Sequence, residues 1–279
     1  MGDRILHITD LHFWAIPGNP LRWLGKRGVG LINVILRRRH EYRTERADEF
    51  AGMLAAIDSA AIIVTGDVSS TALDVEFAQA NAFMEAIRAR GRTVWALPGN
   101  HDIYTRHAFH TRRFERGLSS FLPGPEWPCR QQLPGGTSVV FAPTVYPDFA
   151  ARGYIAKDEI KAVATLVREA PPGPVVVAAH YPLLNTTADY HSIITRRLRN
   201  ADPFRQALGE TGRKILYIAG HVHRPSCTPD KEYPHLSHLT TPPLFRQRHT
   251  PPTDGTFSEI EITDNEFTIT RHHIQNKTT

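Results

Sequence analysis

Short apolar runs with amphipathic segments between them constrain the fold of this 279-residue chain most strongly. Residues 60–65 read AAIIVT, a continuous run typical of a buried strand. Strand patterns also occur at 4–9, 93–97, 139–142, 175–179 and 215–219. Apolar residues with helical spacing lie between them, at 46–59, 74–90 and 157–169. Strands that alternate with helices in this way predict an α/β architecture.

The C-terminal part of the chain departs from this alternation. Residues 257–262 and 267–273 both have strand character, and Asp264-Asn265 between them is typical of a hairpin turn. A hairpin and Pro-rich loops favour a mixed sheet over a purely parallel one. Because we find no internal repeat, linker or shift in composition, we expect a single domain over residues 1–279.

Composition excludes several classes of protein. Hydrophobic residues make up 41% and charged residues 22%, which excludes a disordered chain, a collagen-like fibre and a disulfide scaffold. The net charge of +5 favours anionic partners without selecting one. Cys129 and Cys227 lack zinc-finger spacing, and we expect two free thiols. The N-terminal MGDRILHITD is not a secretory signal, and no apolar run approaches the ~18 residues of a membrane span, so we expect a cytoplasmic protein.

Five short polar motifs each follow the end of an expected strand. In open α/β sheets, ligand sites form at the carboxyl ends of the strands. One such motif has an ordinary explanation, since a lone Asp often caps a turn and a lone His is usually structural. Five in succession, each with a metal-binding side chain, predict a metal site. They are Asp10-Leu11-His12, Gly66-Asp67, Gly99-Asn100-His101-Asp102, His180 and Gly220-His221-Val222-His223.

The spacing within these motifs supports metal ligation. Residues i and i+2 of an extended chain point to the same face, so Asp10 and His12 can reach one ion, and His221 and His223 can face one site. Glycines at 66, 99 and 220 allow sharp turns beside the ligands. Carboxylate, amide and imidazole ligands without thiolate suit Mn, Fe, Zn or Mg. Seven candidate ligands are too many for one tetrahedral ion and suit a pair of ions.

The ordered series DLH, GD, GNHD, H and GHVH resembles the calcineurin-like metallophosphoesterase superfamily. Within it, GNHD with GHVH is similar to a bacterial phosphodiesterase branch that includes cyclic-nucleotide phosphodiesterases and UDP-diacylglucosamine pyrophosphatases. The resemblance implies a β-sandwich of mixed sheets flanked by helices, with a dinuclear metal centre at the strand ends. It also implies two ligand sets that share Asp67: Asp10, His12, Asp67 and His223 for one metal, and Asp67, Asn100, His180 and His221 for the other.

The same resemblance implies a metal-dependent phosphoric ester hydrolase, either a phosphodiesterase or a pyrophosphatase. Two divalent ions, with Mn or Fe favoured and Zn or Mg as alternatives, would generate a bridging hydroxide that attacks phosphorus. His101 matches the catalytic histidine of the family, and Asp102 would orient it. A positioned acid of this kind contributes about 10²–10⁴-fold to the rate.

A basic amphipathic insertion at about residues 18–45 separates the first two motifs. Residues 20–43 hold seven Lys or Arg and one Glu, together with an approximate helical stripe of Leu and Ile. This pattern is typical of a helix that lies on an anionic membrane surface. Candidate membrane contacts are Trp23, Arg37, Arg38 and Arg39. The alternative is a helical cap whose arginines are solvated or bind substrate phosphate.

Three functions remain open from the sequence. The insertion favours hydrolysis of a lipid-linked nucleotide such as UDP-diacylglucosamine, by an enzyme peripheral to the inner face of the membrane. A soluble 3',5'-cyclic-nucleotide phosphodiesterase is the alternative, and a non-catalytic scaffold would be expected to have lost ligands, none of which is missing. His191, Arg196 and Arg197 are candidate substrate-binding residues, although an exposed helix face would look the same. The substrate contains phosphate, and without a readable aromatic-basic groove we do not expect nucleic acid as a partner.

Overall fold

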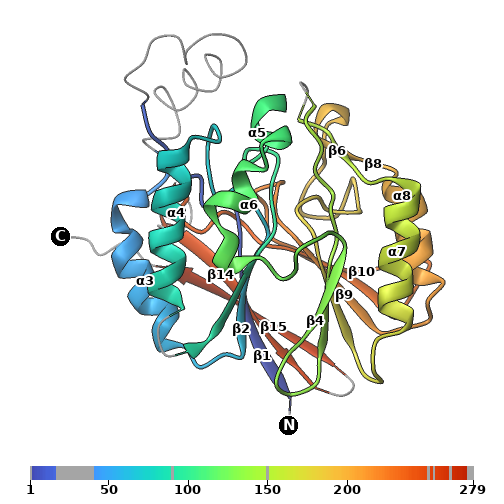
Figure 1. Ribbon diagram of the computed structural model, residues 1–279. Coiled ribbons are helices and arrows are strands. Elements are labelled where there is room, and N and C mark those ends of the chain that lie inside the picture. The colour runs from blue at the N-terminus through green and yellow to red at the C-terminus, as the bar shows by residue number, and fades with distance from the viewer. Residues whose placement is uncertain are drawn as a thin grey trace.

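The computed structural model describes residues 2–16, 41–88, 91–148, 151–249, 252–253, 255–263 and 266–274. Two β-sheets lie face to face, and helices cover the outer face of each sheet (Figure 1). This four-layer arrangement confirms the predicted β-sandwich of mixed sheets flanked by helices. Most of the predicted insertion, including Trp23, Arg37, Arg38 and Arg39, lies outside the described residues.

The first sheet has five strands in the order β15-β14-β1-β2-β3. The strands β1, β2 and β3 are parallel, whereas β14 pairs with both β1 and β15 in antiparallel fashion. The last two strands confirm the predicted C-terminal hairpin. The bounds are β1 Asp3–Ile8, β2 Ala61–Val64, β3 Thr93–Ala96, β14 Gly255–Ile262 and β15 Phe267–Ile274.

The second sheet has six strands in the order β10-β11-β9-β7-β5-β4. Its four inner strands are parallel, and the edge strands β4 and β10 are antiparallel to their neighbours. The bounds are β4 Cys129–Gln132, β5 Ser138–Phe141, β7 Val175–Ala178, β9 Ile215–Ala219, β10 Ser226–Pro229 and β11 Leu236–Thr240. Two short pairs complete the strands: β6 Gly153–Tyr154 with β8 Leu198–Arg199, and β12 Arg248–His249 with β13 Pro252–Thr253.

The helices form two groups. Residues of α3, α4 and α6 pack in the apolar cluster on the outer face of the first sheet, and α7 and α8 pack on the second. The structure confirms the three expected helices with small differences at their ends, and it adds short helices that we did not predict. The bounds are η3 Thr44–Arg46, α3 Ala47–Ala56, α4 Asp74–Ile87, α5 Arg106–His110, α6 Arg113–Gly117, η5 Ser119–Phe121, α7 Lys157–Arg168, η6 Ile194–Arg196 and α8 Ala201–Gly209.

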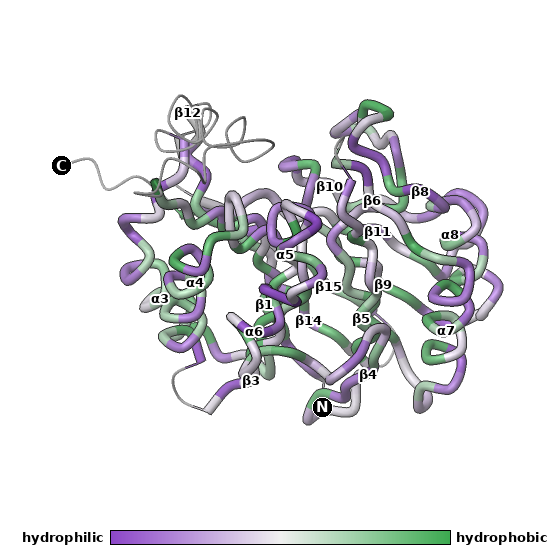
Figure 2. Tube along the Cα trace, turned by 45° about the horizontal axis from the view of Figure 1, so that its top comes forward, coloured by the Kyte–Doolittle hydropathy of each residue, from purple (hydrophilic) through white to green (hydrophobic). Residues whose placement is uncertain are grey.

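Apolar side chains fill the spaces between all four layers. In β2, Ile63 packs between the two sheets, whereas Ile62 and Val64 pack toward the helices. Because both faces of such a strand are covered, its sequence is continuously apolar rather than alternating. Figure 2 shows the result: hydrophobic stretches follow the central strands, and hydrophilic residues gather in the outer loops. This confirms residues 60–65 as a buried strand.

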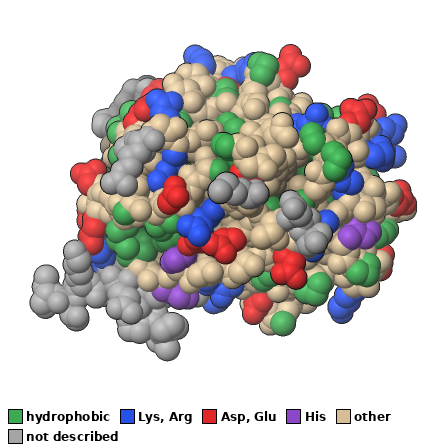
Figure 3. Space-filling model, turned by 90° about the horizontal axis from the view of Figure 1, so that it is seen from below, with side chains coloured by type: hydrophobic (Ala, Val, Ile, Leu, Met, Phe, Trp, Pro, Cys, Tyr) green, Lys and Arg blue, Asp and Glu red, His purple; other side chains and the backbone are tan. Residues whose placement is uncertain are grey.

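The parallel strands of both sheets run in a common direction, so their carboxyl ends lie at one edge of the sandwich. The five polar motifs follow β1, β2, β3, β7 and β9 and therefore meet at this edge. Figure 3 shows the opposite end, where acidic and basic side chains are interspersed. Cys129 and Cys227 are both free thiols, as predicted. Among the described residues, no helix is both long and apolar enough to cross a membrane.

Candidate metal centre

The ligand motifs leave the strands through unusual backbone conformations. Asp10, His12, Asp67, His221 and His223 have φ values of 52°, 51°, 52°, 65° and 56°. This left-handed region is sparsely populated by residues other than glycine, and each such residue costs about 1–3 kcal/mol. We assumed an extended chain in the Asp10-Leu11-His12 and Gly220-His221-Val222-His223 motifs, and this geometry is therefore wrong. The side chains still converge, because successive sharp turns redirect them.

Three glycines make room for this convergence. Gly66 has a φ of 90°, which a side chain would disfavour. A Cβ atom at Gly99 would overlap the backbone and carboxylate of Asp67, and one at Gly220 would overlap the side chains of Thr9 and Asp10. Gly66 therefore serves both the turn and the close approach of the Pro98-Gly99 backbone, while Gly99 and Gly220 allow close approach alone.

A first group of potential ligands consists of Asp10, His12 and His223, whose ligand atoms all lie within 4.8 Å of one another. His223 Nε2 is 3.0 Å from Asp10 Oδ1 and 3.4 Å from His12 Nε2. Asp67 Oδ2 approaches this group at 3.8 Å from His12 Nε2. These four side chains are the ones that the resemblance assigned to the first metal.

A second group lies on the other side of Asp67. Its Oδ1 atom is 3.5 Å from His180 Nε2, so the two oxygens of this one carboxylate face different groups. Asn100 Oδ1 lies 3.1 Å from His180 Nε2 and 3.0 Å from His221 Nδ1. The structure thus brings all seven predicted ligands together. His221 and His223, expected to face one site together, belong to different groups.

The protonation of the second group fits a bound cation. Burial lowers the pKa of His180 and holds that of His221 well below its usual value, which favours the neutral form of both rings. His180 Nδ1 donates to Thr65 O at 2.7 Å, and His221 Nε2 donates to Arg196 O at 3.0 Å. The remaining ring nitrogens then direct lone pairs at Asn100 Oδ1. Two imidazole nitrogens and the amide oxygen of Asn100 can coordinate one cation together, and backbone-fixed imidazoles are usual in metal sites.

Asp10 is the anionic counterpart in the first group. Burial would raise the pKa of this carboxyl, but the charge and hydrogen bond of His223 outweigh burial and lower it. Thr9 Oγ1 and the His221 backbone N–H donate to its other oxygen, at 2.8 and 3.0 Å. A fully buried carboxylate that stays ionised is a suitable ligand for a divalent cation.

His101 lies beside the first group, with its ring centroid 5.0 Å from that of His12. Its Nδ1 donates to Ser70 O at 2.8 Å. We expected Asp102 to orient this ring, but the carbonyl of Ser70 does so. Asp102 instead accepts hydrogen bonds from the backbone N–H groups of Val68, Ser69 and Gly99 and from Ser69 Oγ, and so joins the loops after β2 and β3.

A buried polar network beneath the centre was missed by sequence reasoning. His7 lies between the hydroxyls of Thr65 and Thr241, 2.8 Å from each, and Thr241 is hydrogen-bonded to Ser258. Burial lowers the pKa of His7 to about 3. Because Thr65 also holds His180 through its carbonyl, this network supports the second ligand group. A histidine between the apolar residues Leu6 and Ile8 of β1 was the available signal.

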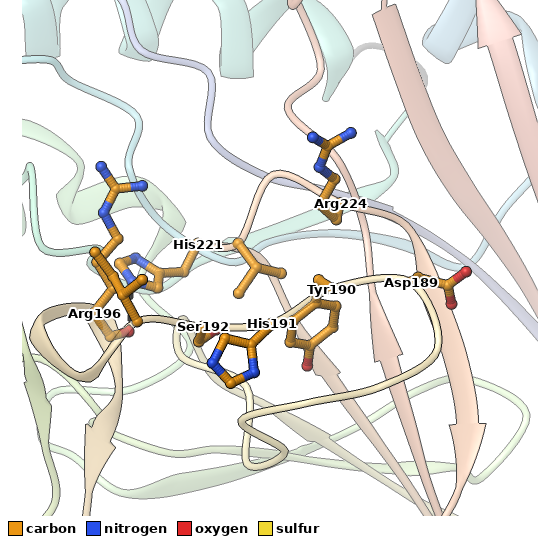
Figure 4. Close-up of a pocket in the computed structure, with 9 residues that line it drawn as sticks. Asp189, Tyr190, His191, Ser192, Arg196, His221 and Arg224 are labelled. Atoms are coloured by element: carbon orange, nitrogen blue, oxygen red, sulfur yellow. Dashed lines mark hydrogen bonds between the residues drawn. The ribbon is translucent and has the colours of Figure 1, made fainter.

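A pocket of about 390 Å³ opens next to His221. It is lined by two of the predicted substrate residues, His191 and Arg196, and by Arg224, which we did not predict. In Figure 4 the guanidinium groups of Arg196 and Arg224 point to the same side of the pocket. Arg197, the third predicted residue, donates through Nε to Ser192 O at 2.7 Å and thereby holds the loop.

The fold and this site define a metal-dependent phosphoesterase. The sequence model of the calcineurin-like phosphoesterases matches residues 3–225, and the chain belongs to this family. No curated protein matches the sequence. The structure is similar to that of a dimetal phosphatase from Danio rerio, with a TM-score of 0.65, 12% identity, and coverage of 97% of this chain and 96% of that chain.

Two larger proteins share the fold over part of their length. A purple acid phosphatase from yellow lupin seeds has a TM-score of 0.62 and 10% identity, with coverage of 98% of this chain and 52% of that chain. A 5'-nucleotidase from Candida albicans has a TM-score of 0.50 and 12% identity, with coverage of 98% of this chain and 52% of that chain. At these identities the likeness concerns the fold, while the family supplies the class of reaction.

Proposed function

We propose that this phosphoesterase hydrolyses a phosphodiester or pyrophosphate bond in a lipid-linked nucleotide, such as UDP-diacylglucosamine. The observation that carries the proposal is the cationic pocket beside His221. A substrate with two phosphates needs one site for the reacting phosphate and another for its neighbour. Arg196 and Arg224 supply donors for the second phosphate, because guanidinium groups bind such oxygens in bidentate fashion.

Exposed apolar side chains lie at one side of the same pocket. Ile193 lines the pocket with 56% of its surface exposed, and the neighbouring Ile194 is 74% exposed. Two adjacent exposed isoleucines are unusual beside a polar pocket. They suit contact with an acyl chain or a membrane surface. The basic insertion provides a second contact of the same kind, with attraction of about 1 kcal/mol for each Lys or Arg near an anionic leaflet.

The seven ligand side chains would hold two divalent ions, and Mn or Fe suits their oxygen and nitrogen atoms. Such ions polarise the phosphoryl oxygens and make a bound water acidic enough to attack near neutral pH. Asp67 directs one oxygen to each ligand group and so fixes their separation. With Nδ1 committed to Ser70 O, His101 can carry a second proton on Nε2 and donate it to the leaving oxygen.

A soluble cyclic-nucleotide phosphodiesterase is the competing function. Its substrate has one phosphate and no lipid, and would leave both the arginines and the exposed isoleucines without a role. A non-catalytic scaffold has less support, since the ligands are all retained and converge.

An activity panel with UDP-diacylglucosamine, cAMP and bis-nitrophenyl phosphate tests the proposal. We expect Arg224→Ala to lower kcat/KM on the lipid-linked pyrophosphate by about 10–100-fold, the value of a charge-assisted hydrogen bond of ~1.5–3 kcal/mol, and to spare bis-nitrophenyl phosphate. Arg116→Ala, which removes an exposed arginine from α6, is the matched control. If wild type cleaves cAMP far better than the lipid-linked substrate, the cyclic-nucleotide function replaces this one.

Vesicle binding tests the insertion. Wild type should co-sediment with anionic vesicles at low salt and leave them at high salt. Replacing Arg37, Arg38 and Arg39 by Glu should abolish this binding and reduce activity on the lipid-linked substrate, yet spare a small diester. If wild type ignores the vesicles, the insertion is a cap.

A further inference from the structure

A second cavity, of about 680 Å³, lies between the loops that follow β3 and β5. It differs from the arginine-lined pocket in both position and chemistry. Pro98 and Ile103 come from the loop that also carries Asn100 and His101, and Val145 and Tyr146 come from the loop after β5.

Both loops connect this aromatic cavity directly to the metal centre. Pro98 is two residues from Asn100, which places their Cα atoms within about 7.6 Å. On the other loop, Thr144 Oγ1 accepts a hydrogen bond from the His180 N–H at 3.2 Å, and the next residue, Val145, lines the cavity. The loops that carry Asn100 or hold His180 therefore also form walls of the aromatic cavity.

Aromatic rings form its walls. Tyr146 is T-shaped against Phe109 at 5.8 Å and against Tyr154 at 5.9 Å, and Trp127 also lines the space. Tyr146 is 52% exposed although three aromatic neighbours are within reach. A planar ring inserted here would cover this exposed face, and offset or edge contacts of this kind stabilise aromatic pairs.

The charges in the cavity select among planar ligands. Glu115, Glu126 and Glu159 line it, together with His110 and Arg112. Arg112 lies 3.8 Å from Glu115, and Glu159 accepts the Ala156 N–H through one oxygen, which leaves Glu126 and the second oxygen of Glu159 for a ligand. Carboxylates accept hydrogen bonds from N–H groups and repel a phosphate. An acyl chain would remove water from them without giving a hydrogen bond in return, which is unfavourable. Aromatic walls with acceptors match a nucleobase, which has a π-face and N–H donors at its edge.

We propose that the aromatic cavity binds the nucleobase of the substrate. This proposal rests on the proposed function and gives the substrate a direction across the centre. The base lies between the β3 and β5 loops, the scissile phosphate lies at the metal ligands, and the second phosphate and the lipid extend toward Arg196, Arg224 and Ile193.

The binding of UMP and of ribose 5-phosphate isolates the contribution of the base. Both ligands carry the same phosphate, so its contacts with the metal ions contribute equally to the two dissociation constants and cancel in their ratio. Calorimetry measures both constants. Wild type should bind UMP about tenfold or more tightly than ribose 5-phosphate, as expected for a stacked base. Tyr146→Ala should bring the ratio close to one, and Tyr146→Phe, which keeps the ring, should retain the preference. Met53→Ala, an exposed apolar truncation on α3, is the control.

The possible outcomes separate the two proposals. A wild-type ratio near one, or an unchanged ratio in a folded Tyr146→Ala variant, refutes the base site whatever the protein hydrolyses. A clear ratio that depends on the ring at 146 supports the base site, even if the lipid-linked pyrophosphate is not cleaved. In that case only the proposed lipid substrate fails.

Discussion

The buried histidine of β1 makes the protein sensitive to acid. His7 is completely buried between two hydroxyl groups, and burial lowers its pKa from 6.5 to about 3. In the unfolded chain this imidazole binds a proton below about pH 6.5, whereas in the folded protein it remains neutral down to about pH 3. Folding stability therefore falls as the pH drops through this window, and it rises with pH because the unfolded state binds more protons.

The size of the effect follows from the shift. A difference of about 3.5 pKa units corresponds to about 5 kcal/mol at full protonation, and lowering the pH from 7.5 to 4.5 removes about 2.7 kcal/mol. His7→Gln retains a polar side chain but does not titrate. At pH 7.5 we expect it to be less stable than wild type by about 1–3 kcal/mol, because hydrogen bonds to Thr65 and Thr241 are weakened. At pH 4.5 this deficit should vanish or reverse.

Urea unfolding of metal-free protein at four pH values between 7.5 and 4.5 measures the difference in stability between wild type and His7→Gln. Because the other histidines are common to both proteins, their contributions cancel in the comparison. His107→Gln, an exposed substitution on α5, controls for the loss of one histidine. Parallel stability curves for wild type and His7→Gln would refute the reasoning, since they would mean that His7 takes up no fewer protons in the folded state than in the unfolded one.

Four further substitutions probe the centre and the loops that carry it. Asp67→Ala should lose both metal ions, and His223→Ala should lose mainly one. Metal analysis of the purified proteins measures this, and full activity of wild type in chelator would contradict a dinuclear centre. His101→Asn should keep its metal content and lose about 10²-fold or more in turnover, and a parallel loss of metal would assign it to ligation instead. Asp102→Asn should lower the free energy of unfolding by about 1–3 kcal/mol, since its amide cannot accept all four hydrogen bonds, and unchanged stability in urea would argue against its role in joining the loops.

The central strands and the ligands could be predicted because their signals are local. Residues 60–65 are apolar without interruption because sheets and helices cover both of their faces. Each ligand motif likewise lies within four consecutive residues. In contrast, α8 at Ala201–Gly209 is short and has a Pro and an Asp in its first turn, so its pattern resembles a loop.

What could not be predicted depends on contacts between distant residues. His7 and Thr241 are 234 positions apart, and no spacing rule relates them. The orientation of His101 depends on the backbone carbonyl of Ser70. Because every residue has such a carbonyl, the sequence does not indicate which one accepts the hydrogen bond. In the left-handed conformations of Asp10 and His12, the backbone N–H groups donate to Gly66 O and Asp67 O, more than 50 positions away, and these contacts were equally unpredictable.

The antiparallel pairing of β14 with β1 has a consequence for the order of events during synthesis. Asp3 lies opposite Ile262, so the strand that leads into Asp10 and His12 lacks one of its two neighbours until residues 255–262 have left the ribosome. The family match ends at residue 225, before either strand of the hairpin has been made. A nascent chain that already contains every ligand would thus still expose one edge of β1. The sheet that carries the first candidate ligands is completed by a segment that supplies none of them.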